Sequence, residues 1–380
     1  MNATAFDAVI VGAGSMGMAA GYYLSRAGQR VVLLDPDDPP HGGASHHGHT
    51  RLIRHAYGEG AAYVPLALRA HELWFDLERL AHTKLFERTG IINAAPEGHP
   101  FIAEVQRSAS QYGLGLQCMD GAQANQRWPA WQLPADHAVC FEADAGVLYC
   151  EKAVGAFRRL ATAQGAVVRA NTAVTRIDPH PDGTASAITA TGEAITGRHV
   201  IVCAGKRTRA LIAPLGLDLP VTRVRKIYGW FDADPHLFGP RLFPGFAVLT
   251  ELGMHYGFPS LEGRGLKAGV HDGGQPVPAD AGLAPFGAKD LADIEVFLRK
   301  HLPGSGNLQT GETCEYDMTP DEHFIVDSVP GLAQVHFATG FSGHGFKFST
   351  AIGEALAQRI TQGGSTSRLS HFSSRRFAKT

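Results

Sequence analysis

The first 35 residues constrain the fold more than any other part of the chain. Residues 7–11 form a short apolar run, and the pattern G-x-G-x-x-G follows at once, with its glycines at Gly12, Gly14 and Gly17. An apolar stretch with helical character comes next, and residues 30–35 form a second apolar run that ends in an acid. A strand before the glycine turn and a helix after it predict a βαβ unit.

This βαβ unit has the features of a dinucleotide-binding turn. Asp35 stands 18 positions after Gly17, close to the spacing at which an acidic side chain accepts hydrogen bonds from the adenosine ribose. Glycines let the backbone approach a pyrophosphate, and unpaired N–H groups at the helix N-terminus favour its negative charge. We therefore predict that Asp35 binds the ribose and that the pyrophosphate is bound by Gly12, Gly14, Ser15, Met16 and Gly17.

The composition restricts the class of function. The chain has 380 residues, of which 44% are hydrophobic and 18% are charged, and this excludes an extended disordered protein. Lys and Arg number 34 and Asp and Glu number 36, so the formal charge is only −2. No basic field favours nucleic acid or an anionic membrane as a partner. We expect small-molecule chemistry instead.

The cysteines and the apolar segments bear on the compartment. Five cysteines are an odd number and include no CxxC pair, so neither a disulfide framework nor a zinc site is predicted. The apolar N-terminal run lacks a basic leader and is broken by glycines, and no uninterrupted apolar stretch reaches about 18 residues. We expect a cytoplasmic protein without a membrane span.

The remaining pattern predicts an α/β fold. Short strands at residues 167–169, 173–177 and 186–190 predict an antiparallel ribbon, and residues 199–205 predict a strand that returns to the parallel sheet. A strand at residues 335–339 and the helix that follows it lead the C-terminal segment back to the dinucleotide.

Two stretches rich in aromatic residues lack the βαβ rhythm and suit a second, antiparallel-sheet domain that covers the substrate. Strands are expected there at residues 226–231 and 255–258. We predict a doubly wound, Rossmann-like dinucleotide domain of residues 1–85, 145–212 and 312–380, and a substrate-binding domain of residues 86–144 and 213–311.

Four sequence blocks carry a family resemblance. They are HHGHTRLIRHAYGEG at residues 46–60, YGFPS with GLKAGVH at 256–271, CEYD with DEHFIVD at 314–327, and GHGFKF at 343–348. In this order the chain resembles the monomeric sarcosine oxidase and N-methyltryptophan oxidase family of amine-oxidising flavoproteins. The resemblance covers nearly the whole chain, and over residues 40–75 the N-methyltryptophan oxidases look closest.

The resemblance implies how FAD is held. The family carries its flavin through a cysteine thioether, and Cys314 is the matching residue. Arg51 is expected against the flavin. The helix after Gly345 would direct its positive end to the flavin, with Lys347 beside it. Further cofactor contacts are expected from Ser45, His46, Gly343 and Gly345.

The resemblance also implies a substrate site. Arg54 and Lys347 match the residues that bind the substrate carboxylate, a pairing that suits a guanidinium fork and a point charge. Lys267 matches the lysine to which the family assigns oxygen activation. The amine pocket is expected to be lined by Tyr256, Tyr316, His271 and His344, whose aromatic faces can hold a partly positive amine.

The implied reaction converts an N-methyl amino acid and oxygen to the primary amino acid, formaldehyde and hydrogen peroxide, in a monomer with no metal. The four histidines at positions 46, 47, 49 and 55 lack the spacing of a helical metal motif. Cyclic imino acids such as pipecolate or proline remain open as substrates, as do a dehydrogenase that uses an electron carrier and a non-enzymatic flavin-binding module. Two departures from the family pattern bear on this, at Lys206-Arg207 and at residues 261–264.

Overall fold

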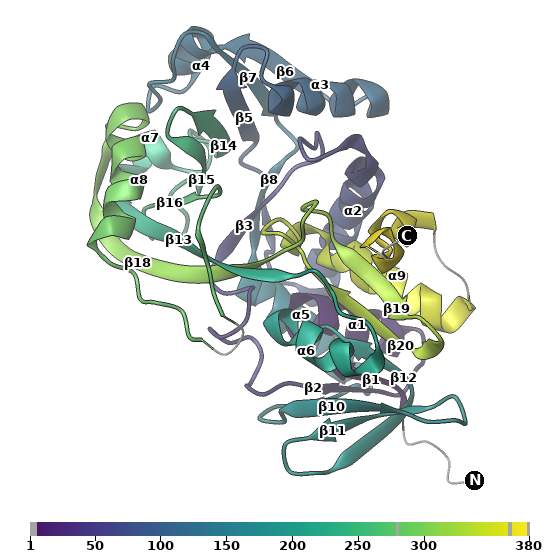
Figure 1. Ribbon diagram of the computed structural model, residues 1–380. Coiled ribbons are helices and arrows are strands. Elements are labelled where there is room, and N and C mark those ends of the chain that lie inside the picture. The colour runs from purple at the N-terminus through teal and green to yellow at the C-terminus, as the bar shows by residue number, and fades with distance from the viewer. Residues whose placement is uncertain (1–5, 279–280, 364–366, 378–380) are drawn as a thin grey trace.

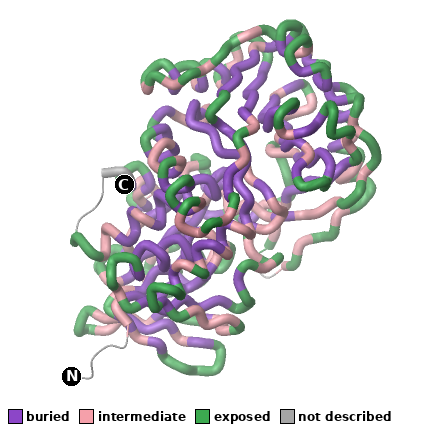
Figure 2. The backbone as a smooth tube through the Cα atoms, turned by 180° about the vertical axis from the view of Figure 1, so that it is seen from behind, coloured by how far each residue is buried: buried purple, intermediate pink, exposed green. Residues whose placement is uncertain are grey.

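The computed structural model describes residues 6–278, 281–363 and 367–377. The chain forms two bodies, each built on a large sheet, and strands run between them (Figure 1). Buried segments run through both bodies, and exposed loops surround them (Figure 2).

The central parallel strands confirm the βαβ unit. Strand β1 (Phe6–Val11) pairs in parallel with β2 (Val31–Leu34) and with β12 (Ala194–Val202). On the far side of β12 lies β20 (Leu332–Thr339), also parallel. The predicted return of residues 199–205 to the parallel sheet is therefore confirmed, and the strand predicted at residues 335–339 is present within β20.

The antiparallel ribbon differs from the prediction in one strand. Strands β10 (Val174–Pro179), β11 (Ala185–Thr189) and β12 pair antiparallel, as expected. Strand β9 (Val167–Arg169) instead pairs in parallel with β2, so its place in the ribbon was wrong. The physical reason is the helix before it: α5 (Cys150–Ala163) crosses over the sheet and delivers β9 to the free edge of β2. Strand β19 (Ile325–Val329) pairs antiparallel with β20.

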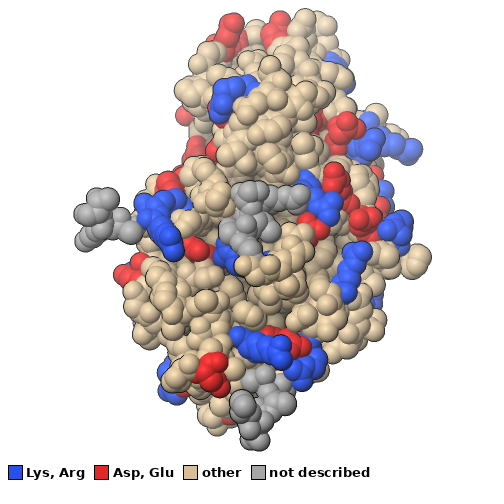
Figure 3. Space-filling view, turned by 90° about the vertical axis from the view of Figure 1, so that its right-hand side faces the viewer, with Lys and Arg blue, Asp and Glu red and all other residues tan. Residues whose placement is uncertain are grey.

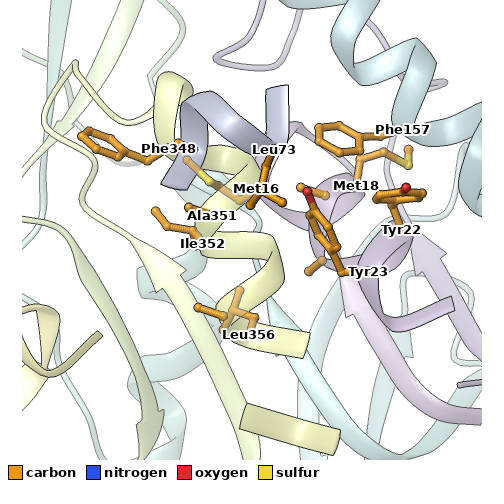
Figure 4. Close-up of a cluster of buried hydrophobic side chains, with 14 of the residues drawn as sticks. Met16, Met18, Tyr22, Tyr23, Leu73, Phe157, Phe348, Ala351, Ile352 and Leu356 are labelled. Atoms are coloured by element: carbon orange, nitrogen blue, oxygen red, sulfur yellow. The ribbon is translucent and has the colours of Figure 1, made fainter. Parts of the chain in front are cut away.

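Four helices bury one face of this sheet. They are α1 (Ser15–Arg26), α2 (Val64–Ala81), α5 and α9 (Ser349–Gln362), and their apolar side chains form a single cluster. Figure 4 shows Met16 and Tyr23 of α1, Phe157 of α5 and Ile352 of α9 among the side chains of this cluster. The other face packs on the β10–β11 hairpin and α6 (Thr208–Ile212).

The nine-stranded sheet forms the second body. Its neighbours run in the order β17-β13-β16-β15-β14-β5-β7-β6, and β18 pairs with β13. The strands are β5 (Ile91–Pro96), β6 (Leu116–Asp120), β7 (His137–Glu142), β13 (Thr222–Ala233), β14 (Gly245–Thr250), β15 (Gly253–Phe258), β16 (Leu266–Val270), β17 (Gln275–Pro276) and β18 (Ser305–Met318). The strands expected at residues 226–231 and 255–258 are thus present, within β13 and β15.

Short elements complete the fold. The helices of the second body are α3 (Pro100–Tyr112), α4 (Gly121–Arg127), α7 (Pro235–Phe238) and α8 (Ala288–His301). A three-stranded sheet of β3 (Thr50–Ile53), β8 (Gly146–Tyr149) and β4 (Phe86–Glu87) adjoins both bodies. The 3-10 turns are η1 (Ala61–Tyr63), η2 (Gly205–Arg207), η3 (Ala213–Leu215), η4 (Phe346–Phe348), η5 (Ser367–Phe372) and η6 (Ser374–Phe377).

Two observations concern possible partners. Among the described residues, no helix combines the length and the apolar character that crossing a membrane requires. On the described part of the face in Figure 3, Lys and Arg lie among Asp and Glu, so charges of both signs are interspersed.

Candidate active site

A cavity of about 510 Å³ lies where the two bodies meet. This volume is within the range of small-molecule sites. Of the predicted site residues, all but Gly17 and Lys267 line it: Gly12, Gly14, Ser15, Met16, Asp35, Ser45, His46, Arg51, Arg54, Tyr256, His271, Cys314, Tyr316, Gly343, His344, Gly345 and Lys347.

The glycine turn leaves the start of α1 open to the cavity. Gly12 has a φ of 92°, and a Cβ there would lie 2.4 Å from the carbonyl oxygen of Cys203. A Cβ on Gly17 would lie 1.8 Å from the carbonyl oxygen of Gly12, so Gly17 allows the turn to pack on the helix. A Cβ on Gly14 would meet only His46, at 3.8 Å. No side chain caps α1 at Gly14, so its N-terminal N–H groups can receive a phosphate.

The carboxylate of Asp35, which lines the cavity, is held by backbone N–H groups. Its carboxylate accepts hydrogen bonds from the N–H of Ala13 at 2.7 Å and of Asp37 at 3.0 Å. Within the described ranges, the one grouping with metal-ligand atoms less than 4.8 Å apart is Asp35, Asp37 and His41. It occupies the predicted ribose position, and none of the four histidines at 46–55 belongs to it.

Buried polar atoms without partners face this cavity. Both ring nitrogens of His46 lack a hydrogen bond among the described residues, and burial lowers the pKa of His46 to about 3. Asp317 Oδ1 is likewise unpaired. Burial, with the like charge of Glu315, raises the pKa of Asp317 to about 7. Such groups need polar partners, which a polar ligand in the cavity would provide.

Two buried cations converge on Tyr57. The guanidinium carbon of Arg54 lies 5.0 Å from the centre of the Tyr57 ring, and the ammonium of Lys347 lies 5.2 Å from it. Arg54 is 6% exposed and Lys347 is 5% exposed. Arg54 donates to Glu59 at 2.5 Å. Burial, together with Arg54, lowers the pKa of Lys347 to about 7.

Hydrogen bonds fix the protonation of His344. Its Nε2 lies 3.1 Å from the carbonyl oxygen of Glu322, which can only accept, so Nε2 carries the proton. Its Nδ1 therefore accepts from the Tyr57 hydroxyl, at 2.7 Å. That hydroxyl in turn accepts from Lys347 at 3.1 Å. Burial lowers the pKa of His344 to about 3, consistent with a neutral ring.

Lys267 lies outside the cavity lining. It is 2% exposed, and its ammonium donates to the carbonyl oxygen of Gly48. The ammonium also lies 4.5 Å from the ring centre of Tyr228 and 4.9 Å from that of Phe258. Burial and the positive charge of Arg51 lower the pKa of Lys267 to about 7.

Cys314 faces the cavity from β18. It is buried and packs with Tyr228, Trp230 and Tyr316. Burial raises the pKa of its thiol, while three nearby cations, Arg51, Lys267 and Lys226, oppose that effect. The net shift of the pKa is upward, so the neutral thiol is favoured, and the three cations reduce the cost of ionising it.

Comparison with known proteins decides the family. Residues 7–359 match the model of the FAD dependent oxidoreductase family. The chain belongs to this family. It is 43% identical to monomeric sarcosine oxidase of Bacillus sp. (strain B-0618) over 375 residues, which cover 97% of this chain and 96% of that protein. It is 41% identical to N-methyl-L-tryptophan oxidase of Yersinia pestis (strain Pestoides F), covering 98% and 99%.

Solved structures share the fold of this FAD-dependent oxidoreductase. The L-proline dehydrogenase of P. horikoshii matches with a TM-score of 0.87 at 19% identity and covers 98% of both chains. Glycine oxidase of Geobacillus kaustophilus matches with a TM-score of 0.83 at 19% identity, covering 98% of this chain and 99% of that one. The predicted α/β fold with a Rossmann-like FAD domain is confirmed.

The cavity residues fit FAD. The open start of α1 suits its pyrophosphate, the Asp35 carboxylate suits its ribose, and the unpaired atoms of His46 and Asp317 offer polar contacts. At the Lys206-Arg207 departure both side chains line the cavity, and Lys206 lies 3.2 Å from Glu315. The departure thus places an ion pair at the cavity.

The sequence did not predict that Glu142 would hold the backbone next to Arg54. The Glu142 carboxylate on β7 accepts from the backbone N–H of His55 at 3.0 Å and of Ala56 at 3.0 Å, and also contacts the His55 ring. Glu142 is 3% exposed. Nothing in its local sequence marks it, whereas Tyr57 and Glu59 lie inside the quoted block and could have been singled out.

Proposed function

We propose that this FAD-dependent oxidase acts on N-methyl amino acids and uses oxygen as the acceptor, yielding the primary amino acid, formaldehyde and hydrogen peroxide. The observation that carries the proposal is the convergence of Arg54 and Lys347 on Tyr57 at the cavity wall. Two buried cations beside a cavity form a receptor for one carboxylate. The names of the two relatives support an N-methyl amino acid as the ligand.

Glu59 forms an ion pair with Arg54 in the absence of substrate. Burial raises its pKa, but the positive charge of Arg54 and other neighbours outweighs this and lowers the pKa of Glu59 to about 2. Glu59 therefore stays ionised and paired at neutral pH. A substrate carboxylate joins or replaces this partner, so binding leaves no buried cation unpaired.

The remaining lining residues orient the amine. Tyr256 on β15 and Tyr316 on β18 supply aromatic walls. Burial lowers the pKa of His271 to about 4, so its ring is neutral at pH 7 and can hydrogen-bond the amine without adding a positive charge. An uncharged amine is the form that releases a hydride. FAD, when bound, supplies the hydride acceptor.

We further propose that Cys314 forms the covalent link to FAD and that Lys267 provides positive charge for oxygen reduction. The cations around Cys314 and the aromatic enclosure of Lys267 support these roles. We also propose that the enzyme works as a monomer in the cytoplasm. Its proposed FAD-binding domain comprises residues 1–85, 145–212 and 312–380, and its substrate domain comprises residues 86–144 and 213–311.

A substrate panel tests the activity. Sarcosine, N-methyl-L-tryptophan, pipecolate and proline would each be mixed with the holoenzyme, with peroxide measured in air and flavin bleaching measured without oxygen. Peroxide from an N-methyl amino acid, with formaldehyde in equal amount, is expected. Bleaching without peroxide would indicate a dehydrogenase, peroxide from cyclic substrates alone would move the assignment to imino acids, and no bleaching would leave a binding module.

A further inference from the structure

Two cysteines face each other at the edge of the nine-stranded sheet. Cys118 on β6 is the direct partner of Cys140 on β7 in the antiparallel register. Their sulfur atoms lie 3.4 Å apart. Directly opposed residues in antiparallel strands have Cα atoms about 4.5–5.5 Å apart, which is within the range a disulfide requires. A bond between these sulfurs therefore needs side-chain adjustment only.

The two thiols differ in access. Cys118 is exposed, and its sulfur accepts a hydrogen bond from the Gln106 side chain at 3.7 Å. Cys140 is 0% exposed and packs among Ala56, Ile102 and other apolar side chains. A small oxidant in solution thus reaches Cys118 first, while Cys140 is available only to Cys118.

We propose that Cys118 and Cys140 form a reversible disulfide when the protein meets hydrogen peroxide. The peroxide source, turnover at the enzyme's own cavity, rests on the proposed function, but the reactivity of the pair does not. Neither residue lines the cavity, so the disulfide protects the protein from its product without stopping catalysis.

The reaction balances in two steps. The Cys118 thiolate attacks one peroxide oxygen, the O–O bond breaks, and hydroxide leaves and takes up the proton that the thiol released. The Cys140 sulfur then attacks the resulting sulfenic acid, the S–S bond forms, and the departing hydroxide takes the Cys140 proton. Two thiols are oxidised and one peroxide is reduced to two waters. Because the partner stands ready, Cys118 is intercepted before it reaches the irreversible sulfinic acid.

Two other cysteines serve as internal references. Cys150 and Cys203 are buried, and no second sulfur contacts them among the described residues. Burial raises the pKa of each to about 12, as it does for Cys140. Cys150 is also away from the cavity, so peroxide should leave it reduced while it consumes the facing pair. Cys203 lines the cavity and shows how a thiol without a sulfur partner reacts there.

The test uses the holoenzyme with reagent peroxide. After treatment, the protein would be unfolded in an alkylating agent and its peptides mapped by mass spectrometry. We expect a linked Cys118–Cys140 peptide with a loss of about 2 Da, the mass of two hydrogens, reversed by a dithiol, while Cys150 remains alkylated. A free Cys118, or Cys118 as sulfinic acid with Cys140 alkylated, would overturn the proposal.

Two variants test the order of attack, and a turnover experiment tests the source of the peroxide. In Cys140→Ala, Cys118 should gain two oxygens under the same peroxide, whereas Cys118→Ser should keep Cys140 reduced and basal activity unchanged. Oxidation of Cys140 in Cys118→Ser would overturn the order of attack. A turnover arm, with and without catalase, tests the source: the link should form only without catalase. If reagent peroxide forms the link and turnover does not, the source is wrong and the oxidase assignment is at fault rather than the cysteine pair.

Discussion

Lys347 is a buried cation that we propose binds the substrate carboxylate, and its burial lowers the stability of the folded protein. Its folded pKa of about 7 is below the ordinary value of 10.5. The unfolded chain therefore binds the proton more tightly, and stability falls as pH drops from about 10.5 to about 7, where the folded state also becomes protonated.

We expect Lys347→Met to raise the free energy of unfolding by about 1–4 kcal/mol near pH 7, because an apolar side chain removes a buried charge. The same variant should bind N-methyl amino acids about tenfold to hundredfold more weakly. Thermal unfolding at pH 7 and pH 10 measures the first effect, and the gain should shrink at the higher pH. An N-methyl amine without a carboxylate is the control substrate. Equal weakening of its binding would contradict the proposed role of Lys347 in binding the carboxylate.

We propose that Lys267 acts only in the oxidative half of the reaction. Lys267→Met should leave anaerobic flavin reduction within a few fold of wild type and slow reoxidation by about 10². Because the Lys267 pKa is about 7, wild-type reoxidation should also slow as pH rises above that value, and the variant should lose this pH dependence. Stopped-flow measurement of each half-reaction separates the two. Slow reduction with normal reoxidation would contradict this role and assign Lys267 to the oxidation of substrate.

Cys314 can be tested against a neighbour in the same cavity. Cys314→Ser should release FAD when the protein is precipitated with acid, whereas wild type and Cys203→Ser should keep the yellow colour in the pellet. Cys203 is the matched control because it also lines the cavity. Retention of flavin by Cys314→Ser would assign the link to another residue.

At the scale of elements, strand β7 holds the backbone that follows Arg54. Its last residue, Glu142, accepts the backbone N–H groups of His55 and Ala56, and Arg54 precedes them directly. The second body thus holds a loop whose cation serves the cavity. We propose that Glu142 is a positioning residue.

Glu142→Gln weakens this anchor while keeping its shape. We expect KM for carboxylate substrates to rise about tenfold with a smaller change in kcat, because misplacement affects binding geometry. The flavin spectrum should be unchanged, and an N-methyl amine without a carboxylate should be unaffected. Glu104→Gln is the control, since Glu104 also accepts a backbone N–H, from Ala61 at 2.9 Å, but is more exposed. Equal effects in the two variants would rule out a specific role for Glu142.

Features that depend on a short local segment could be predicted from the sequence, whereas features that depend on contacts between distant segments could not. The glycine turn was predictable because one short segment contains the strand, the turn and the helix start. The partner of β9 was not, because three residues carry no register information. The roles of Glu142 and of the Cys118–Cys140 contact could not be predicted either, because each depends on which strands pair. In addition, no local sequence pattern identifies a carboxylate that will be buried.

At the scale of the molecule, the two ends of the chain meet in one core. Helices α1 and α9 cross so closely that a Cβ on Gly353 would lie 2.7 Å from the backbone of Ala19. This packing brings α1, which follows the glycine turn, against α9, which follows the GHGFKF block at residues 343–348.

We expect Gly353→Ala to lower the free energy of unfolding by about 1–3 kcal/mol through overpacking. Gly155→Ala on α5 is the matched control, because its Cβ would meet only the Arg159 side chain at 3.8 Å. That change should be stabilising by up to about 1 kcal/mol from helix propensity. Denaturant unfolding of both variants measures this, and equal stability would show that the helices can separate at little cost.

The crossing of α1 and α9 also has a consequence for biosynthesis. The glycine turn is translated first, yet the helix that packs on α1 is translated some 330 residues later. At about 5–20 residues per second, the nascent chain waits tens of seconds with the apolar face of α1 lacking this partner. The cavity residues Gly343 and Lys347 stand just before α9, so the proposed FAD site is complete only once this late segment has been synthesised and has packed on α1.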